Sequence, residues 1–186
     1  MDQTPGMSDS SSPLERLILE RLDAAVRDSG AVARISRIVE RVDGILARDP
    51  EAIEAWEPIP LDVYRSWLPE EIRSSWVFVL RHGVATGAER HPNSRQRMVS
   101  WRGTGDFRVH DGQRWLSHLM ASGAEGSLVE RWISIPPNTW HQGVVGDADW
   151  AVVSFHTVPA GELIEERPGP DEAATRRRRY LDTTQA

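Results

Sequence analysis

The chain has 186 residues, 39% of them hydrophobic, and a formal net charge of −6, which fits one domain with an extension and argues against a basic nucleic-acid surface. It contains neither cysteine nor lysine, so disulfide bonds, thiolate metal sites and a lysine Schiff base are excluded. Any bound metal must therefore be held by nitrogen and oxygen ligands.

The first residues are small and polar, and we predict that 1–12 are disordered. They contain no basic stretch followed by an apolar one, so they do not resemble a secretory signal. No segment has the apolar length needed to cross a bilayer. We therefore expect a soluble, cytoplasmic protein without a membrane partner.

Residues 13–58 are predicted to be an N-terminal helical segment. Ser12 to Glu15 has the pattern of a capping box with proline at the first helical position. Two apolar stripes at helical spacing follow: Leu14, Leu17, Ile18, Leu22, Ala25 and Val26, then Val32, Ile35, Val39, Val42 and Leu46. The first helix should end near Ser29-Gly30 and the second at Asp49-Pro50. These stripes must cover the remaining domain, each other or a second subunit, and we expect a homodimer.

From Trp76 the pattern changes to short apolar or alternating runs separated by turn residues. The predicted strands are 76–82, 87–91, 96–101, 105–109, 129–135, 140–145 and 150–157. Evenly spaced short strands are typical of an all-β sandwich or barrel, which we place at 59–160. Residues 161–186 are predicted to be a polar tail, in which Arg176 to Arg179 are solvated and neutralised by the acidic stretch at 162–172.

The residues with the strongest chemical signal lie between 83 and 103. Glu89 and His91 are two apart, so on a strand their side chains share a face. A turn at 92–94 precedes Gln96, which opens the next strand and can face the same pair. His141 follows another turn into a later strand.

The spacing of these residues resembles the first motif of the cupin superfamily, which has Gly, five residues, His-x-His, three or four residues, Glu, six residues and Gly. Here the sequence has Gly83, five residues, Glu89-x-His91, four residues, Gln96, six residues and Gly103. Every spacing fits, but Glu89 replaces the first histidine and Gln96 replaces the glutamate. The resemblance covers about 76–157 and implies a mainly β fold, a cupin-type jelly-roll barrel, with the two amphipathic helices outside it.

The second cupin motif, Pro-x-Gly-x-x-His, is similar to residues 136–141. Asn138 takes the glycine position, which is reasonable because asparagine tolerates the left-handed conformation. Another register of the first motif starts from His91 and places Asn93 at the second histidine and Arg97 near the acid. That register loses both glycines, and we prefer the one with Glu89.

The resemblance implies a metal pocket formed by Glu89, His91, Gln96 and His141. Two histidines and one carboxylate suit non-haem Fe(II), while Mn, Ni or Zn are alternatives. Gln96 is either a weak fourth ligand or a hydrogen-bonding neighbour. The open alternative is a polar pocket without a metal. His156, at the end of a predicted strand, is a candidate acid or base if it faces the pocket, or else a structural histidine.

The leading functional hypothesis is a metal-dependent enzyme acting on a small polar organic substrate, with an Fe(II)-dependent oxygenase preferred. The alternatives are a cupin isomerase or lyase, with or without metal, and a non-catalytic protein that binds a small ligand. The sequence does not identify the substrate.

Overall fold

The computed structural model describes residues 12–65, 68–123, 125–170 and 174–182. Disorder was predicted for residues 1–12, and all of these except Ser12 lie outside the described residues. The helices are α1 (Pro13–Arg27), α2 (Ser29–Arg48) and α3 (Leu128–Arg131), with short 3-10 turns at Leu61–Tyr64, Ala160–Glu162 and Tyr180–Asp182. The strands are β1 (Glu54–Pro58), β2 (Ser74–Leu80), β3 (Gln96–Arg102), β4 (Thr104–His110), β5 (Trp115–Leu116), β6 (Leu119–Ala121), β7 (Trp132–Ile135), β8 (His141–Val145), β9 (Trp150–His156), β10 (Ile164–Arg167) and β11 (Arg176–Arg179). None of the described helices has the length and apolar character required to span a membrane.

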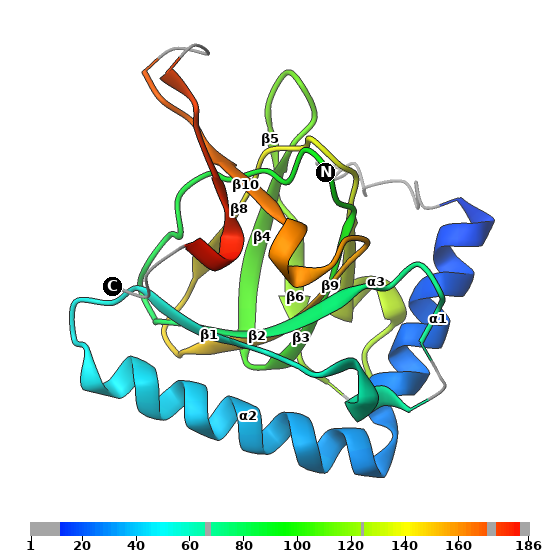
Figure 1. The fold of residues 1–186 in the computed structure, drawn as a ribbon. Helices are drawn as coiled ribbons and strands as arrows, with labels where there is room; N and C mark the ends of the chain where they lie inside the picture. The colour runs from blue at the N-terminus through cyan, green and yellow to red at the C-terminus, as the bar shows by residue number, and fades with distance from the viewer. Residues whose placement is uncertain (1–11, 66–67, 124, 171–173, 183–186) are drawn as a thin grey trace, which may run out of the picture.

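The two larger of the three sheets have the strand order of a jelly roll (Figure 1). One sheet runs β1-β2-β9-β3-β7; in the other, β4 pairs with β8 on one side and with β5 and β6 on the other. Residues 84–90 join β8 through the bridges Ala85 to Val144 and Glu89 to His141. When this segment counts as one strand, and β5 with β6 as another, β2 to β9 make eight barrel strands. They pair first with last, second with seventh, third with sixth and fourth with fifth. That nested pairing is the jelly roll used by cupins, so the predicted cupin-type barrel is confirmed.

The structure corrects three predicted boundaries. Residues 54–58, assigned to the helical segment, form β1 and pair with β2 at the sheet edge. Residues 87–91 make only isolated bridges instead of a regular strand. Residues 129–131, predicted as the start of the strand 129–135, belong to α3 because Ser127 and Glu130 make a reciprocal capping box at the start of this helix.

The two N-terminal helices meet one residue earlier than expected. Ser12 caps α1 by accepting the N–H of Glu15 at 3.2 Å. The chain turns at Asp28, whose carboxylate accepts the N–H groups of Gly30 and Ala31 at 3.0 and 3.2 Å. Asp28 therefore caps α2, and Gly30 lies in the first turn of α2 and does not end α1.

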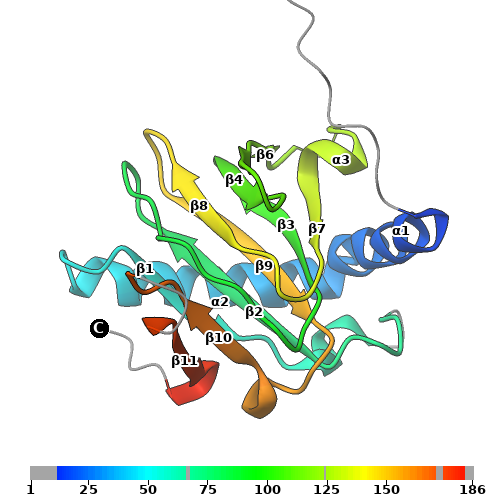
Figure 2. The ribbon, with the colours of Figure 1, turned by 90° about the horizontal axis from the view of Figure 1, so that it is seen from above.

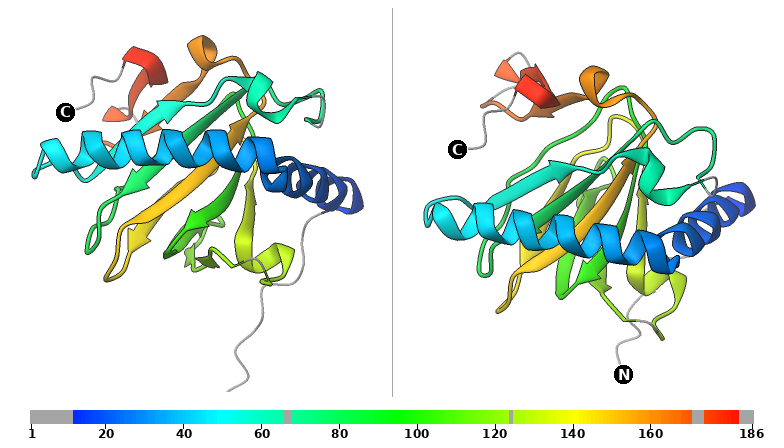
Figure 3. Two further views of the ribbon diagram at one scale, coloured as in Figure 1. Left: turned by 90° about the horizontal axis from the view of Figure 1, so that it is seen from below. Right: turned by 60° about the horizontal axis from the view of Figure 1, so that its bottom comes forward.

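The helices cover the outer face of the five-stranded sheet (Figure 3). Leu22 of α1 and Ile35 of α2 are fully buried in the cluster that joins the helices to this sheet, whereas Leu14 is 67% exposed. A buried ion pair also links the layers, because Arg97 of β3 donates to Glu15 of α1 at 2.6 Å. This contact supplies the carboxylate that a fully buried guanidinium requires.

The C-terminal residues fold over the mouth of the barrel, so the polar tail predicted for 161–186 is wrong for the part that the structure describes. β10 and β11 form an antiparallel hairpin in which Glu165 lies opposite Arg178. Tyr180 is 4% exposed and packs against Trp56 and Trp76. In Figure 2 the hairpin (orange to red) lies on the side of β1 and β2. The acidic and arginine-rich runs thus pair across strands, an arrangement that their composition alone does not distinguish from a solvated tail.

Candidate metal centre

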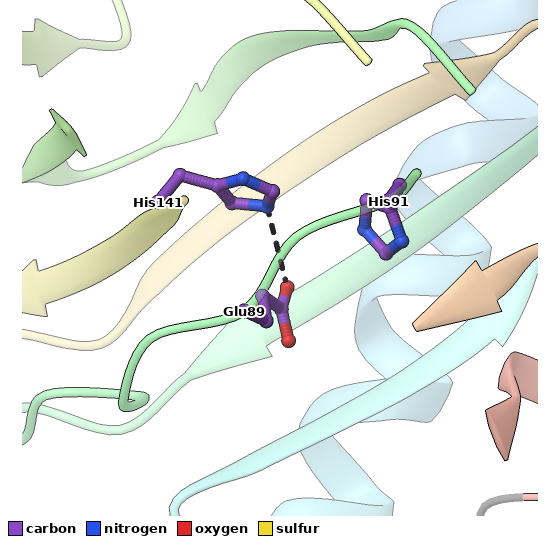
Figure 4. Close-up of side chains that lie close together, drawn as sticks. All are labelled: Glu89, His91 and His141. Carbon is purple, nitrogen blue, oxygen red and sulfur yellow. Dashed lines mark ion pairs between the residues drawn. The ribbon is translucent and has the colours of Figure 1, made fainter. Parts of the chain in front are cut away.

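Glu89 and His141 face each other across two neighbouring strands of the barrel. Each donates its backbone N–H to the carbonyl of the other, at 2.9 and 2.8 Å, so their side chains project from the same face. The Glu89 Oε1 and His141 Nε2 atoms are 3.6 Å apart. His91 lies two residues after Glu89, and one ligand atom from each of the three side chains lies within 4.8 Å of the others (Figure 4).

Both histidines have one ring nitrogen committed to a backbone carbonyl. The Nδ1 of His91 lies 2.9 Å from the carbonyl of Ile164, and the Nδ1 of His141 lies 2.9 Å from that of Thr139. Because a carbonyl only accepts, each Nδ1 carries the proton and each neutral ring keeps a lone pair on Nε2. This is the arrangement in which histidine binds a metal through one nitrogen and is oriented through the other.

Unpartnered polar atoms provide the test of whether a metal fits these residues. Four buried side-chain atoms of the described residues have no hydrogen-bond partner. Two are donors, the Nε1 of Trp76 and the Nη1 of Arg97; the two that can act as ligands are the Nε2 of His141 and the Oε1 of Gln96. Leaving such atoms unpaired is costly, and buried polar atoms normally have a partner. Two imidazole nitrogens, one carboxylate and one amide oxygen make a donor set for a divalent transition metal. The residues therefore fit a metal ion.

The charge state of the site also suits a cation. Burial raises the pKa of Glu89, but His141, His91 and Arg167 together outweigh this effect and lower the pKa to about 2. Burial lowers the pKa of His91, although the charge of Glu89 opposes that shift. At neutral pH the site thus offers an ionised carboxylate beside neutral imidazole, the protonation state required for metal ligation.

Gln96 and His156 lie next to this group on the inner wall of the barrel. They are direct partners across β3 and β9, and both are buried. The His156 ring is 5.1 Å from that of His91, and its nearest hydroxyl groups, of Ser94 and Ser154, are 3.4 and 3.5 Å away. Burial, followed by the neighbouring histidines, lowers the pKa of His156 well below its usual value, so the ring is neutral. Its role as acid or base stays a prediction.

Backbone conformation favours the motif register that starts from Glu89. Gly83 and Gly103, the two glycines of that register, have φ of +71° and +85°. A Cβ at Gly103 would come within 2.9 Å of the Asp149 carbonyl oxygen. Asn138 has φ of +63°, the left-handed conformation expected of a residue at the glycine position of the second motif. Arg97, which the other register places near the acid, is paired with Glu15 on the opposite face of β3.

A small cavity beside Glu89 contains a carboxyl group that the sequence motifs do not include. Its volume is about 30 Å³, room for about one water molecule. Glu54 of β1 lines this cavity. The one feature of the sequence that could have indicated its position is the two-residue step to Trp56, which also faces inward. Burial raises the pKa of Glu54 to about 7, and the charge of Glu89 adds to this shift while Arg167 opposes it. The cavity wall is otherwise formed by Phe78, Leu80, Thr86, Glu89, Gln96, Met98, Phe107, Gln142, Gly143 and Val152.

Glu54 should make the stability of the metal-free protein depend on pH. Since its pKa is raised in the folded state, its contribution is retained at low pH and is lost as the pH rises towards 7. Glu54→Gln should therefore stabilise the protein by about 2 kcal/mol at pH 8 and change it little at pH 4. Urea unfolding at both pH values measures this, with Glu51→Gln at an exposed carboxylate as the control. An equal effect of Glu54→Gln at both pH values would contradict the assignment.

Comparison with known proteins finds no match to a family model and no similar curated protein. Solved structures similar to this chain include an oxalate oxidase in complex with glycolate, at 13% identity and a TM-score of 0.45 over 58% of this chain and 52% of that one. Pumpkin seed globulin is 16% identical, with a TM-score of 0.49 over 64% of this chain and 29% of the globulin. The Lactobacillus farciminis oxalate decarboxylase formate complex is 15% identical, with a TM-score of 0.44 over 57% of this chain and 29% of the decarboxylase. The match thus spans about half of the oxidase and under a third of the other two. At these identities their activities do not transfer to this chain.

Proposed function

We propose that this protein is a metal-dependent enzyme of cupin fold that acts on a small polar organic molecule inside the barrel. Glu89, His91 and His141 would hold the metal, with the Gln96 amide oxygen as a fourth ligand or a neighbouring acceptor. The observation that carries the proposal is the buried Nε2 of His141, which has no hydrogen-bond partner among the described residues and lies 3.6 Å from the Glu89 carboxylate. A divalent ion would satisfy this nitrogen and offset the charge of the carboxylate.

Iron(II) is the preferred ion, with Mn, Ni and Zn as alternatives, because two histidines and one carboxylate form the ligand type of non-haem iron oxygenases. A bound Fe(II) ion would supply electrons for the reduction of O₂. The protein's residues would hold the substrate and move protons: the neutral His156 ring can accept one, and the Glu54 carboxyl can give or take one near neutral pH. Without cysteine or lysine, no covalent route runs through those residues.

The small cavity volume implies that an organic substrate enters only when side chains at the mouth of the barrel move. Those side chains belong to the C-terminal hairpin and Tyr180. The homodimer and the cytoplasmic location stay predictions.

Oxygen consumption tests the reaction type. The Fe(II)-loaded protein is expected to consume O₂ with at least one member of a panel of small acids, thiols and catechols, and His141→Ala should remove this uptake. An oxygen electrode and anaerobic controls measure the effect. Turnover that proceeds equally without O₂ would contradict the oxygenase assignment and favour the lyase or isomerase. Binding of panel compounds without turnover would favour the non-catalytic alternative.

A further inference from the structure

β10 contacts two of the three candidate ligands, although it lies outside the strands that form the jelly roll. The Nη2 of Arg167 donates to the Glu89 Oε2 at 2.9 Å. The carbonyl of Ile164 accepts the Nδ1–H of His91 at 2.9 Å. One short strand thus fixes the carboxylate of one ligand and the ring orientation of another.

The Arg167 guanidinium is itself held rigidly. Its Nε donates to Glu165 at 2.7 Å and its Nη1 to the carbonyl of Thr86 at 3.1 Å. Glu165 is 1% exposed and also accepts from Arg178 of β11 at 2.7 Å. Each of the three guanidinium nitrogens therefore has an acceptor, and β11 anchors the carboxylate that orients the group.

β10 is attached to the segment that carries Glu89 and His91. Arg90 and Glu166 exchange backbone hydrogen bonds at 3.0 and 2.9 Å, and their side chains pair at 2.7 Å. The Asn93 amide donates to the carbonyl of Glu162 at 2.7 Å and accepts the N–H of Ile164 at 3.1 Å. Asn93 consequently holds the backbone of Ile164 through its N–H group, and the carbonyl of the same residue orients His91.

We propose that Arg167 and Asn93 are positioning residues of the metal site, so that the C-terminal hairpin is part of the site as well as its cover. This inference rests on the proposed function. Arg167 holds the Glu89 Oε2, while Oε1 is the oxygen that faces His141. Groups that orient ligands in this way commonly contribute about 10- to 100-fold to metal affinity.

The test measures Mn(II) affinity of the full chain by calorimetry, together with thermal unfolding of the metal-free protein. Arg167→Ala and Asn93→Ala should each weaken Mn(II) binding by about 10- to 100-fold. Arg167→Lys retains the charge but loses the planar set of donors, so it should bind Mn(II) more tightly than Arg167→Ala and less tightly than the wild type. Arg177→Ala is the matched control, because Arg177 is on the same hairpin, its side chain is 62% exposed, and its ion pair, at 3.7 Å, is with Glu166 and not with a candidate ligand. It should bind Mn(II) like the wild type.

The outcomes separate this inference from the proposed function. If the wild type binds Mn(II) and both Arg167→Ala and Asn93→Ala bind it equally well, the positioning role is wrong and the metal site stands. If Arg177→Ala loses as much affinity as Arg167→Ala, the effect comes from the hairpin's general stability and the specific role is also wrong. If the wild type binds no Mn(II), both the metal site and the positioning role are wrong. Should Arg167→Ala not fold, Arg167→Lys and Asn93→Ala still decide the question.

Discussion

Replacing His141 with alanine is expected to weaken binding of Fe(II) or Mn(II) by more than about 100-fold, since loss of a ligand should exceed the 10- to 100-fold typical of residues that only orient one. His141 offers a buried nitrogen that no other described group satisfies. Calorimetric titration under anaerobic conditions measures the change.

Two further variants make this first prediction specific. Glu89→Gln retains the shape of the side chain but removes its charge, and it should cause a loss of similar size. His82→Ala is the histidine control, because that ring is 59% exposed and pairs with Asp149 away from the site. Equal affinity of His141→Ala and the wild type, or an equal loss in His82→Ala, would show that any bound metal lies elsewhere.

The second large effect concerns the helices that cover the sheet. Leu22→Ala should lower the free energy of unfolding by about 2–5 kcal/mol, because it opens a cavity in the layer between α1 and the five-stranded sheet. Leu14→Ala, the same substitution on the same helix, should change it by less than about 0.5 kcal/mol, since Leu14 is 67% exposed. Urea unfolding of both variants gives the comparison.

Similar destabilisation by Leu22→Ala and Leu14→Ala would contradict the packing of α1 described here. It would instead indicate that the exposed face of the helix is covered in solution, as in the predicted homodimer. The mass of the protein in solution would then distinguish that assembly from a monomer.

The barrel and the ligand spacing could be predicted from sequence because both follow local rules. A two-residue step along a strand places Glu89 and His91 on one face, and the turn at Asn138 directs His141 towards them. Alternation of polar and apolar residues gave the positions of β2, β3, β4, β8 and β9 to within a few residues. These features depend on residues that are neighbours in the chain, so they can be predicted without knowledge of the tertiary structure.

The parts that the sequence did not predict depend on distant partners. The hairpin of β10 and β11 forms because acidic residues at 165 and 166 meet arginines more than ten positions later. Glu54 enters the site only because β1 adds to the edge of β2 and turns alternate residues inward. Arg97 lies on the outer face of β3, where α1 covers it and supplies Glu15. No local pattern encodes such contacts.

The most direct test of the central claim is to locate the ion itself. Crystals of the protein grown or soaked with Mn(II) should show one anomalous difference peak per chain, in contact with the Glu89 carboxylate and the Nε2 atoms of His91 and His141. The same crystals should show whether the Gln96 amide oxygen turns towards the ion. A metal peak at any other position, or none between these three side chains at saturating Mn(II), would contradict the account.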